Sequence, residues 1–140
     1  FGSQCIVLGV DPVRNEDTGK FPSGYEVTIC GFRQRTGLDL LEWVRRAEDL
    51  GAGEIVVNSV DADGTRAGYE INLTRMVADS VRIPVVASGG AGTPQHLADV
   101  FTQAHADAAI IASMVHTGEY TIARIKDELI RAGIPIRRHW

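Results

Sequence analysis

The chain has 140 residues, of which 44% are hydrophobic and 23% are charged, and its formal net charge is −4. This composition indicates one globular domain over residues 1–140, and the negative charge argues against a nucleic-acid partner. The sequence has neither 18 consecutive apolar residues nor a signal-peptide pattern, so we expect no membrane contact and a cytoplasmic location. Because Cys5, Cys30 and the four histidines show no ligand spacing, we expect buried thiols, no metal and no cofactor.

The first predicted element is a strand over residues 5–11, whose continuously apolar core indicates coverage on both faces and hence a parallel sheet. Residues 12–37 are polar and rich in Gly and Pro, which predicts a long loop with a short alternating strand at 25–29. Long loops of this kind usually carry function or partner contacts.

A helix is predicted next, because Asp39 can cap its first turn and Glu42 follows three residues later. Gly51 and Gly53 end it. Its buried stripe is predicted at Leu40, Leu41, Val44, Ala47 and Leu50.

Strands and helices then alternate to the end of the chain. The predicted strands are 55–60, 83–88 and 108–113, and the predicted helices are 72–80, 94–104 and 119–132. The whole pattern is four strands with a helix after each.

The most informative stretch is 83–92, in which a β-branched strand runs into three glycines. Thr93 and Pro94 follow as a helix N-cap and a first-turn proline, an arrangement that binds phosphate through backbone N–H groups. Carboxyl ends of parallel strands meet at one edge, so the strand ends near residues 64 and 113 join this loop in one anion-binding rim. Rims of this kind belong to (βα)8 barrels, but those need about 250 residues.

Several motifs, in order along the chain, resemble the cyclase subunit of imidazole glycerol phosphate synthase (HisF). They lie at 1–11, 36–37, 51–55, 58–65, 88–92 and 118–121. The resemblance covers essentially the whole chain and implies a (βα)4 half of a TIM barrel, the carboxyl-terminal one. The family enzyme takes ammonia from a glutaminase partner. It condenses the ammonia with a bis-phosphorylated ribulosyl aminoimidazole-carboxamide nucleotide and releases imidazole glycerol phosphate, a lyase reaction of histidine biosynthesis.

The resemblance implies that Asp11 is one of two catalytic aspartates. Ring closure and bond breakage need a proton acceptor and a proton donor, which two carboxylates in different environments can supply. The family's other aspartate is on the first barrel strand, which these 140 residues do not contain. Asp11 could instead form a turn before Pro12, a position where the family more often has alanine.

The phosphate and substrate residues are also implied by the resemblance. Phosphate is assigned to Gly64, Ser88, Gly89, Gly90, Ala112 and Ser113, where small side chains let backbone N–H groups touch the oxygens. Substrate is assigned to Asn58, Asp61, Asp63 and Thr65. Alternatives remain for three of these features: an Asx turn for Asp61, a satisfied core amide for Asn58, and a plain strand-to-helix turn for the glycine loop.

At the opposite end of the strands, Glu54 corresponds to a charged residue of the family's ammonia gate, with a solvated glutamate as the alternative. Gln4 would lie on the same face, near the docking surface for the glutaminase. His116 matches a family residue, but Thr117 replaces the usual aromatic beside it.

A lone half-barrel would leave the inner sheet face bare and both edge strands unpaired. We therefore expect completion by an amino-terminal half-barrel or by a second copy of the chain, as a homodimer. Two alternative functions remain: an excised or designed half-barrel that folds and assembles without turnover, and the sister phosphoribosyl isomerase of the same pathway. The residues at 2–4, Glu54 and 118–121 favour the cyclase.

Overall fold

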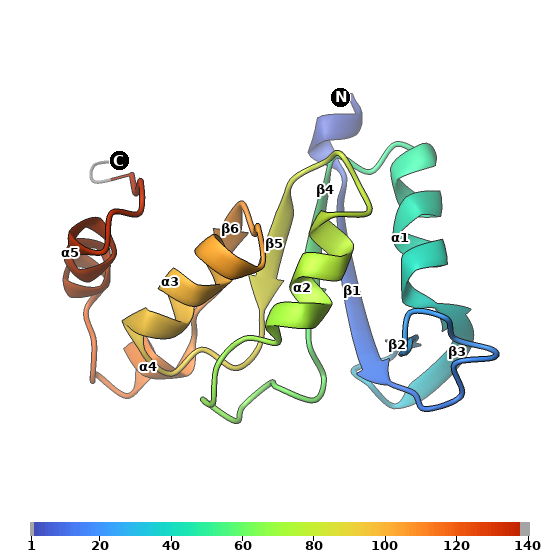
Figure 1. Cartoon of the computed structure of the whole chain (residues 1–140), viewed down its shortest axis with the longest axis horizontal. Coiled ribbons are helices and arrows are strands. Elements are labelled where there is room, and N and C mark those ends of the chain that lie inside the picture. The colour runs from blue at the N-terminus through green and yellow to red at the C-terminus, as the bar shows by residue number, and fades with distance from the viewer. Residues whose placement is uncertain (1, 138–140) are drawn as a thin grey trace.

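The computed structural model describes residues 2–137, which form a six-stranded sheet with strand order β3-β2-β1-β4-β5-β6 (Figure 1). β1 pairs in parallel with β4, β4 with β5, and β5 with β6, whereas β2 runs antiparallel to both β1 and β3. The strands are β1 Val7–Arg14, β2 Tyr25–Ile29, β3 Gln34–Asp39, β4 Glu54–Asn58, β5 Val85–Ser88 and β6 Ala108–Ala109.

Each parallel strand is followed by a helix, as the sequence predicted, although the β2–β3 hairpin lies between β1 and its helix. The helices are a 3-10 turn η1 Ser3–Cys5, then α1 Leu40–Asp49, α2 Ile71–Ala78, α3 Pro94–Gln103, α4 Ser113–His116 and α5 Ile122–Arg131. The expected capping at Asp39 is confirmed, because its carboxylate accepts from the amides of Leu41 and Glu42. Thr93 likewise caps α3, with Pro94 in the first turn.

The hairpin is the main departure from the expected order. Residues 12–37 are not a long loop: β1 continues through Pro12 to Arg14, where it pairs with β2, and β3 was not predicted at all. Side chains hold the hairpin together, since Thr36 donates its hydroxyl to the carbonyl of Val27 at 2.7 Å. β3 lacks the apolar alternation on which strand prediction depends.

Three further expectations on local structure were wrong. β6 covers two residues rather than six, because the chain turns after Ala109 into the short helix α4. Leu50 is 74% exposed, since it forms the C-cap of α1 rather than part of the buried stripe. Both Cys5 and Cys30 are exposed, not buried.

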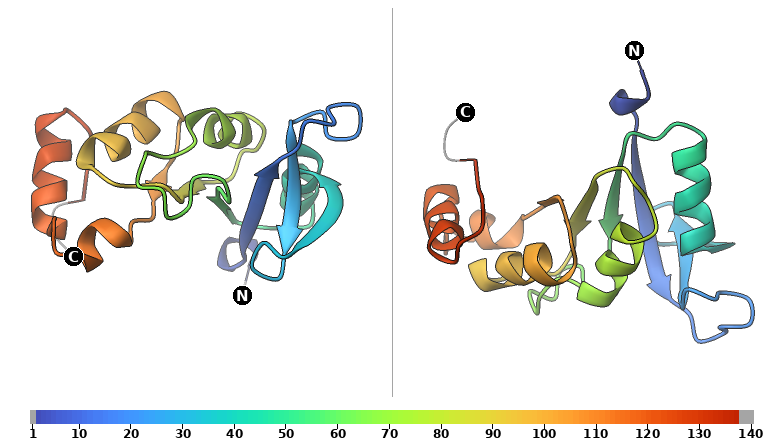
Figure 2. Two further views of the ribbon diagram at one scale, coloured as in Figure 1. Left: turned by 90° about the horizontal axis from the view of Figure 1, so that it is seen from below. Right: turned by 45° about the horizontal axis from the view of Figure 1, so that its top comes forward.

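Two hydrophobic clusters attach the helices to the sheet. In the first, side chains of β1, β4 and β5 pack against α1 and α2; in the second, the end of β5 packs with α3, α4 and α5. The first contains Val10, Leu40, Val44, Ile55, Val57, Leu73, Val77 and Val85, and the second contains Ala87, Leu97, Val100, Met114, Ile125 and Leu129. α2 and α3 lie side by side along the sheet (Figure 2).

The other face of the parallel strands is only partly covered. Alternation along the strands places Val7 and Val56 there. Val7 is 50% exposed, and Ile110, directly after β6, is 45% exposed. The expectation that both edges are unpaired was half wrong: β2 covers β1 from Asp11 onwards, but the stretch 7–10 pairs with β4 alone. None of the helices within residues 2–137 is long and apolar enough to cross a membrane.

Candidate anion and acid-base site

A cavity of about 110 Å³ opens where β4, β5 and β6 end. We call it the anion pocket. It is lined by Asp63, Gly64, Arg66, Ser88, Gly89, Gly90, Ala91, Ile110, Ala112 and Ser113. The structure therefore brings together all six residues to which the resemblance assigned phosphate, from three strand ends that are up to 49 residues apart.

The glycines of the pocket keep backbone donors open. Within residues 2–137, the amides of Gly64, Gly89 and Gly90 donate to no protein acceptor. All three glycines have positive φ angles, between 74° and 99°. Concave groups of such amides form sites for anions without any lysine or arginine.

The same glycines also let two loops touch. A Cβ at Gly90 would lie 2.1 Å from the carbonyl oxygen of Gly68, and one at Gly92 would lie 2.2 Å from that of Arg66. The amide of Gly68 donates to the carbonyl of Gly90 at 2.8 Å. Close backbone approach is thus a second reason for glycine here, and the motif alone did not reveal it.

Asp11 is connected to the pocket through one side chain. Asn58 donates from Nδ2 to Oδ1 of Asp11 at 3.3 Å, and its own Oδ1 accepts from the Ser88 hydroxyl at 3.0 Å. The three residues lie on adjacent strands β1, β4 and β5, on the face away from the helices. The chain of hydrogen bonds runs from the carboxylate to the wall of the anion pocket.

Two of the predicted substrate residues lie elsewhere. Asp61 and Thr65 line a separate cavity of about 520 Å³ beside Arg14. Asp61 accepts from the amide of Arg14 at 2.9 Å, and the Thr65 hydroxyl donates to the carbonyl of Ala62 at 2.7 Å. Both side chains therefore form hydrogen bonds that stabilise the local fold. Asp63 lines the anion pocket with Gly64.

Sequence reasoning missed Glu70, whose side chain is only 8% exposed. Its Oε1 accepts from the Tyr25 hydroxyl at 2.6 Å and from Nε of Arg14 at 2.7 Å, while Oε2 accepts from the Ser59 hydroxyl at 2.6 Å. Burial raises the pKa of Glu70, but these three hydrogen bonds outweigh burial and hold it below its usual range. Nothing in the local sequence marked this residue, because Arg14 and Tyr25 are 56 and 45 positions away.

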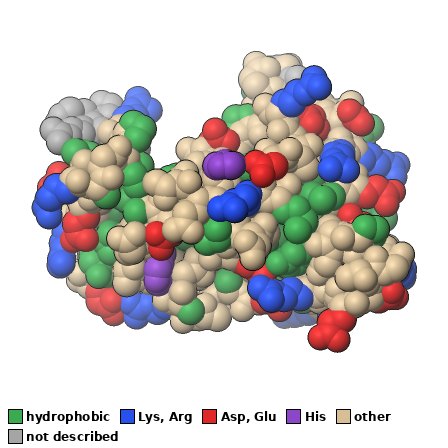
Figure 3. Space-filling model, viewed as in Figure 1, with side chains coloured by type: hydrophobic (Ala, Val, Ile, Leu, Met, Phe, Trp, Pro, Cys, Tyr) green, Lys and Arg blue, Asp and Glu red, His purple; other side chains and the backbone are tan. Residues whose placement is uncertain are grey.

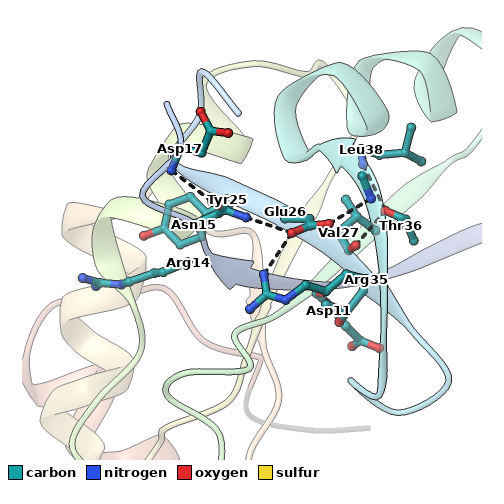
Figure 4. Close-up of polar contacts among 12 residues, drawn as sticks. Asp11, Arg14, Asn15, Asp17, Tyr25, Glu26, Val27, Arg35, Thr36 and Leu38 are labelled. Carbon is teal, nitrogen blue, oxygen red and sulfur yellow. Dashed lines mark hydrogen bonds and ion pairs between the residues drawn. The ribbon is translucent and has the colours of Figure 1, made fainter. Parts of the chain in front are cut away.

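Glu26 is a second buried carboxylate, in the middle of the hairpin (Figure 4). It accepts from Asn15, from the guanidinium of Arg35 and from the amide of Gly37, each at 2.9 Å. Burial raises the pKa of Glu26, yet the three donors lower it below its ordinary value. In Figure 4 the side chains of Asp11 and Arg14 point to opposite sides of β1, so Asp11 stays clear of these networks.

A model of a protein family described as histidine biosynthesis protein matches residues 1–121. The chain belongs to this family. It is 61% identical over all 140 residues to the imidazole glycerol phosphate synthase subunit HisF of Syntrophobacter fumaroxidans, and 57% and 56% identical to those of Desulforapulum autotrophicum and Oleidesulfovibrio alaskensis. In each case it covers 54% of the relative, so the chain spans about half the length of the curated relatives that it matches. The parallel strands β1, β4, β5 and β6 of this α/β fold are consistent with half of a TIM barrel of the histidine biosynthesis protein family.

Two further predicted residues lie at the other end of the sheet in the structure of this family member. Glu54 is the first residue of β4 and pairs with Val7, and Gln4 lies in the turn η1 just before β1. Both therefore lie at the amino end of the parallel strands, opposite the anion pocket (Figure 1).

The surface of this histidine biosynthesis family member carries both signs of charge. On the side drawn in Figure 3, acidic and basic side chains are interspersed without an extended field of one sign. In the described part of the chain, no group of three or more His, Cys, Asp and Glu side chains could hold a metal ion.

Proposed function

We propose that the chain is the carboxyl-terminal half of an imidazole glycerol phosphate synthase cyclase, acting in the cytoplasm. One observation carries the proposal: residues from three strand ends surround a single small cavity with open backbone amides. An anion pocket of this kind suits one phosphate of a bis-phosphorylated substrate. The HisF name of the relatives favours the cyclase over the sister isomerase.

Asp11 acts in this proposal as a general acid or base. Its carboxylate lies at the same end of the sheet as the anion pocket and is joined to it through Asn58 and Ser88. A substrate whose phosphate is bound by the pocket would have its reacting part over Asp11. The resemblance puts the second catalytic aspartate outside these 140 residues, so the proposed chain turns over substrate only with an amino-terminal half-barrel.

The partly open sheet face is the proposed joint with that half-barrel or with a second copy. Val7 and Ile110 are half exposed, and residues 7–10 have one open edge. Burying such aliphatic side chains contributes about 1.5–3 kcal/mol each. Sedimentation of the 140-residue chain should show association that Val7→Lys weakens, whereas Leu50→Lys, on the far end of α1, should not. A monomer at tens of micromolar would contradict this part of the proposal.

A glutaminase is the further proposed partner, docked at the amino end of the strands where Glu54 and Gln4 lie. Ammonia from this partner would pass Glu54 on its way to the substrate. The alternative of an assembly module without turnover differs in one result: mixing with an amino-terminal half should restore ammonia-dependent activity only if the cyclase proposal is right.

The pocket itself is tested by titrating the 140-residue chain with inorganic phosphate while following amide chemical shifts. We expect the amides of Gly64, Gly89, Gly90 and Ser113 to move together and to saturate. Amides of the hairpin, such as that of Gly37, serve as the internal control because Glu26 already accepts from them. Unmoved pocket amides would overturn the proposal.

A further inference from the structure

We infer that Arg66 is the cationic ligand of the anion pocket and that Glu119 competes with the anion for it. The inference rests on the proposed function, since it concerns the same pocket. The resemblance assigned neither residue to phosphate. Together they would make the affinity of the pocket depend on an ion pair that the ligand must open.

Arg66 is placed to meet a bound anion. Of the residues that line the anion pocket, it alone carries a positive charge, and Asp63 adds a negative one. Without Arg66 the side chains of the lining would therefore carry only the negative charge of Asp63, against which the backbone amides alone would have to hold a phosphate dianion. Its Nε is buried and has no hydrogen-bond partner within the described residues, so one donor of the guanidinium is left over.

The other side of the guanidinium is held by Glu119, from the segment between α4 and α5. Nη2 of Arg66 is paired with Oε2 of Glu119, and the two side chains are 35% and 47% exposed. This contact links the loop after β4 with the segment beyond β6, on either side of the pocket. The hydrogen bond from Arg66 holds the pKa of Glu119 below its usual range, so the competitor stays charged near neutral pH.

The backbone of Arg66 is held in place by its neighbours. The residue has a φ angle of 60°, and its carbonyl oxygen packs against Gly92, where a Cβ would lie 2.2 Å away. The neighbouring Gly68–Gly90 hydrogen bond fastens the same loop. Adjustment to a ligand therefore falls to the Arg66 side chain and its ion pair.

Arg66 should leave Glu119 and bind the anion instead, for a physical reason. An exposed Arg–Glu pair is weak, because water and salt compete with it. A phosphate dianion carries more charge than a carboxylate and accepts two parallel N–H bonds from a guanidinium. In the pocket it also receives the amides of Gly89 and Gly90, which Glu119 does not, so a bound phosphate takes Arg66 from Glu119.

The test is a double-mutant cycle on the full 140-residue chain, with inorganic phosphate as the probe and its Kd as the readout. Arg66→Gln should weaken binding roughly tenfold or more, and Glu119→Gln should tighten it about two- to fivefold. In the Arg66→Gln background, Glu119→Gln should have little further effect, because the competition needs the guanidinium. Glu128→Gln is the matched control, since it opens the comparable exposed pair Arg124–Glu128 on α5 and should leave the Kd unchanged.

Three outcomes would overturn the inference: an Arg66→Gln chain with wild-type affinity, weaker binding in Glu119→Gln, or equal effects of Glu119→Gln in both backgrounds. The last would mean simple repulsion between Glu119 and the anion. These failures are distinct from a failure of the proposed function, in which the pocket amides of the wild-type chain do not respond to phosphate at all.

Discussion

The carboxyl end of the sheet has two sides that treat polar groups in opposite ways. On the hairpin side, Glu26 and Glu70 are buried, and their carboxylate oxygens accept hydrogen bonds from other parts of the chain. On the pocket side, the amides of Gly89 and Gly90 donate to no acceptor among residues 2–137. Polar groups that are satisfied internally stabilise the fold, whereas those left open remain for a ligand.

The difference teaches that charge alone is a poor guide to the site. Glu70 accepts three hydrogen bonds at this rim, and its partners make it a structural residue. Asp61 and Thr65 resembled substrate residues and are occupied by contacts of their own loop. Glycine, with no side chain at all, marks the open donors.

Replacing Asp11 by Asn should give the largest effect. In the complex with an amino-terminal half, we expect turnover to fall ~10²–10⁴-fold, because a proton-transfer group is lost. Phosphate affinity and stability should stay near wild type, since Asp11 does not line the anion pocket and touches its wall only through Asn58 and Ser88. Steady-state kinetics and a phosphate titration measure both, with the exposed Asp49→Asn on α1 as control. Turnover that Asp11→Asn leaves unchanged would refute its catalytic role.

Gly90→Ala should disrupt the contact between the two loops on the pocket side. The new Cβ would lie 2.1 Å from the carbonyl oxygen of Gly68, at a φ angle of 99°. We expect a loss of about 3–5 kcal/mol in the free energy of unfolding, measured with urea. Gly31→Ala is the matched control, because its φ angle is also positive but its Cβ would meet nothing within 4 Å; it should cost about 1 kcal/mol. Equal losses would show that close loop approach is unimportant.

Glu70→Ala should disrupt the hydrogen-bond network on the hairpin side. The hydroxyls of Tyr25 and Ser59 and the guanidinium of Arg14 would lose their shared acceptor, which should cost about 2–3 kcal/mol of stability. Phosphate should still shift the amides of Gly89 and Gly90. Glu128→Ala, which removes an exposed ion pair, should cost at most about 0.5 kcal/mol in the same urea experiment. A variant that loses phosphate binding without losing stability would reverse the assignment of the two sides.

The smallest effect is in the pH dependence of stability. Glu26 and Glu70 have pKa values below the ordinary 4.5 when folded, so they stabilise the chain fully above about pH 4.5. This contribution is lost as the pH falls through the lowered values. Unfolding measured between pH 6 and pH 3 should therefore be less pH-dependent in Glu70→Gln than in wild type. An identical pH dependence of unfolding in the two chains would mean that the charge of Glu70 does not stabilise the fold.

The regular part of the fold could be predicted because its causes are local. Apolar strands, the caps Asp39 and Thr93, and the glycines after the strands located the βα units to within a few residues. β3 could not be predicted, since it is polar and depends on contacts such as that between Thr36 and Val27 across the hairpin. β6 was overestimated because an apolar run cannot show where the chain turns away from its neighbour.

The residues of the candidate site also divide into those with a local sequence signature and those that depend on tertiary contacts. The glycine loop and Ser113 were found because a strand followed by small residues has a local signature. Glu70 and Arg66 were missed, since their roles depend on partners such as Tyr25 and Glu119, 45 and 53 positions away, that only the tertiary structure brings close. The close approach of Gly90 to Gly68 was likewise invisible before the two loops were placed.

In the proposed acid-base role of Asp11, the contact with Asn58 bears on which carboxylate oxygen would take the proton. An ionised carboxylate only accepts, so the amide must present its NH2 to Asp11, and the Ser88 hydroxyl on the amide oxygen holds it in that orientation. Oδ1 of Asp11 is thereby occupied along its line to Asn58. In that proposed role, Oδ2, which does not contact Asn58, would be the more open oxygen for a proton taken from a substrate.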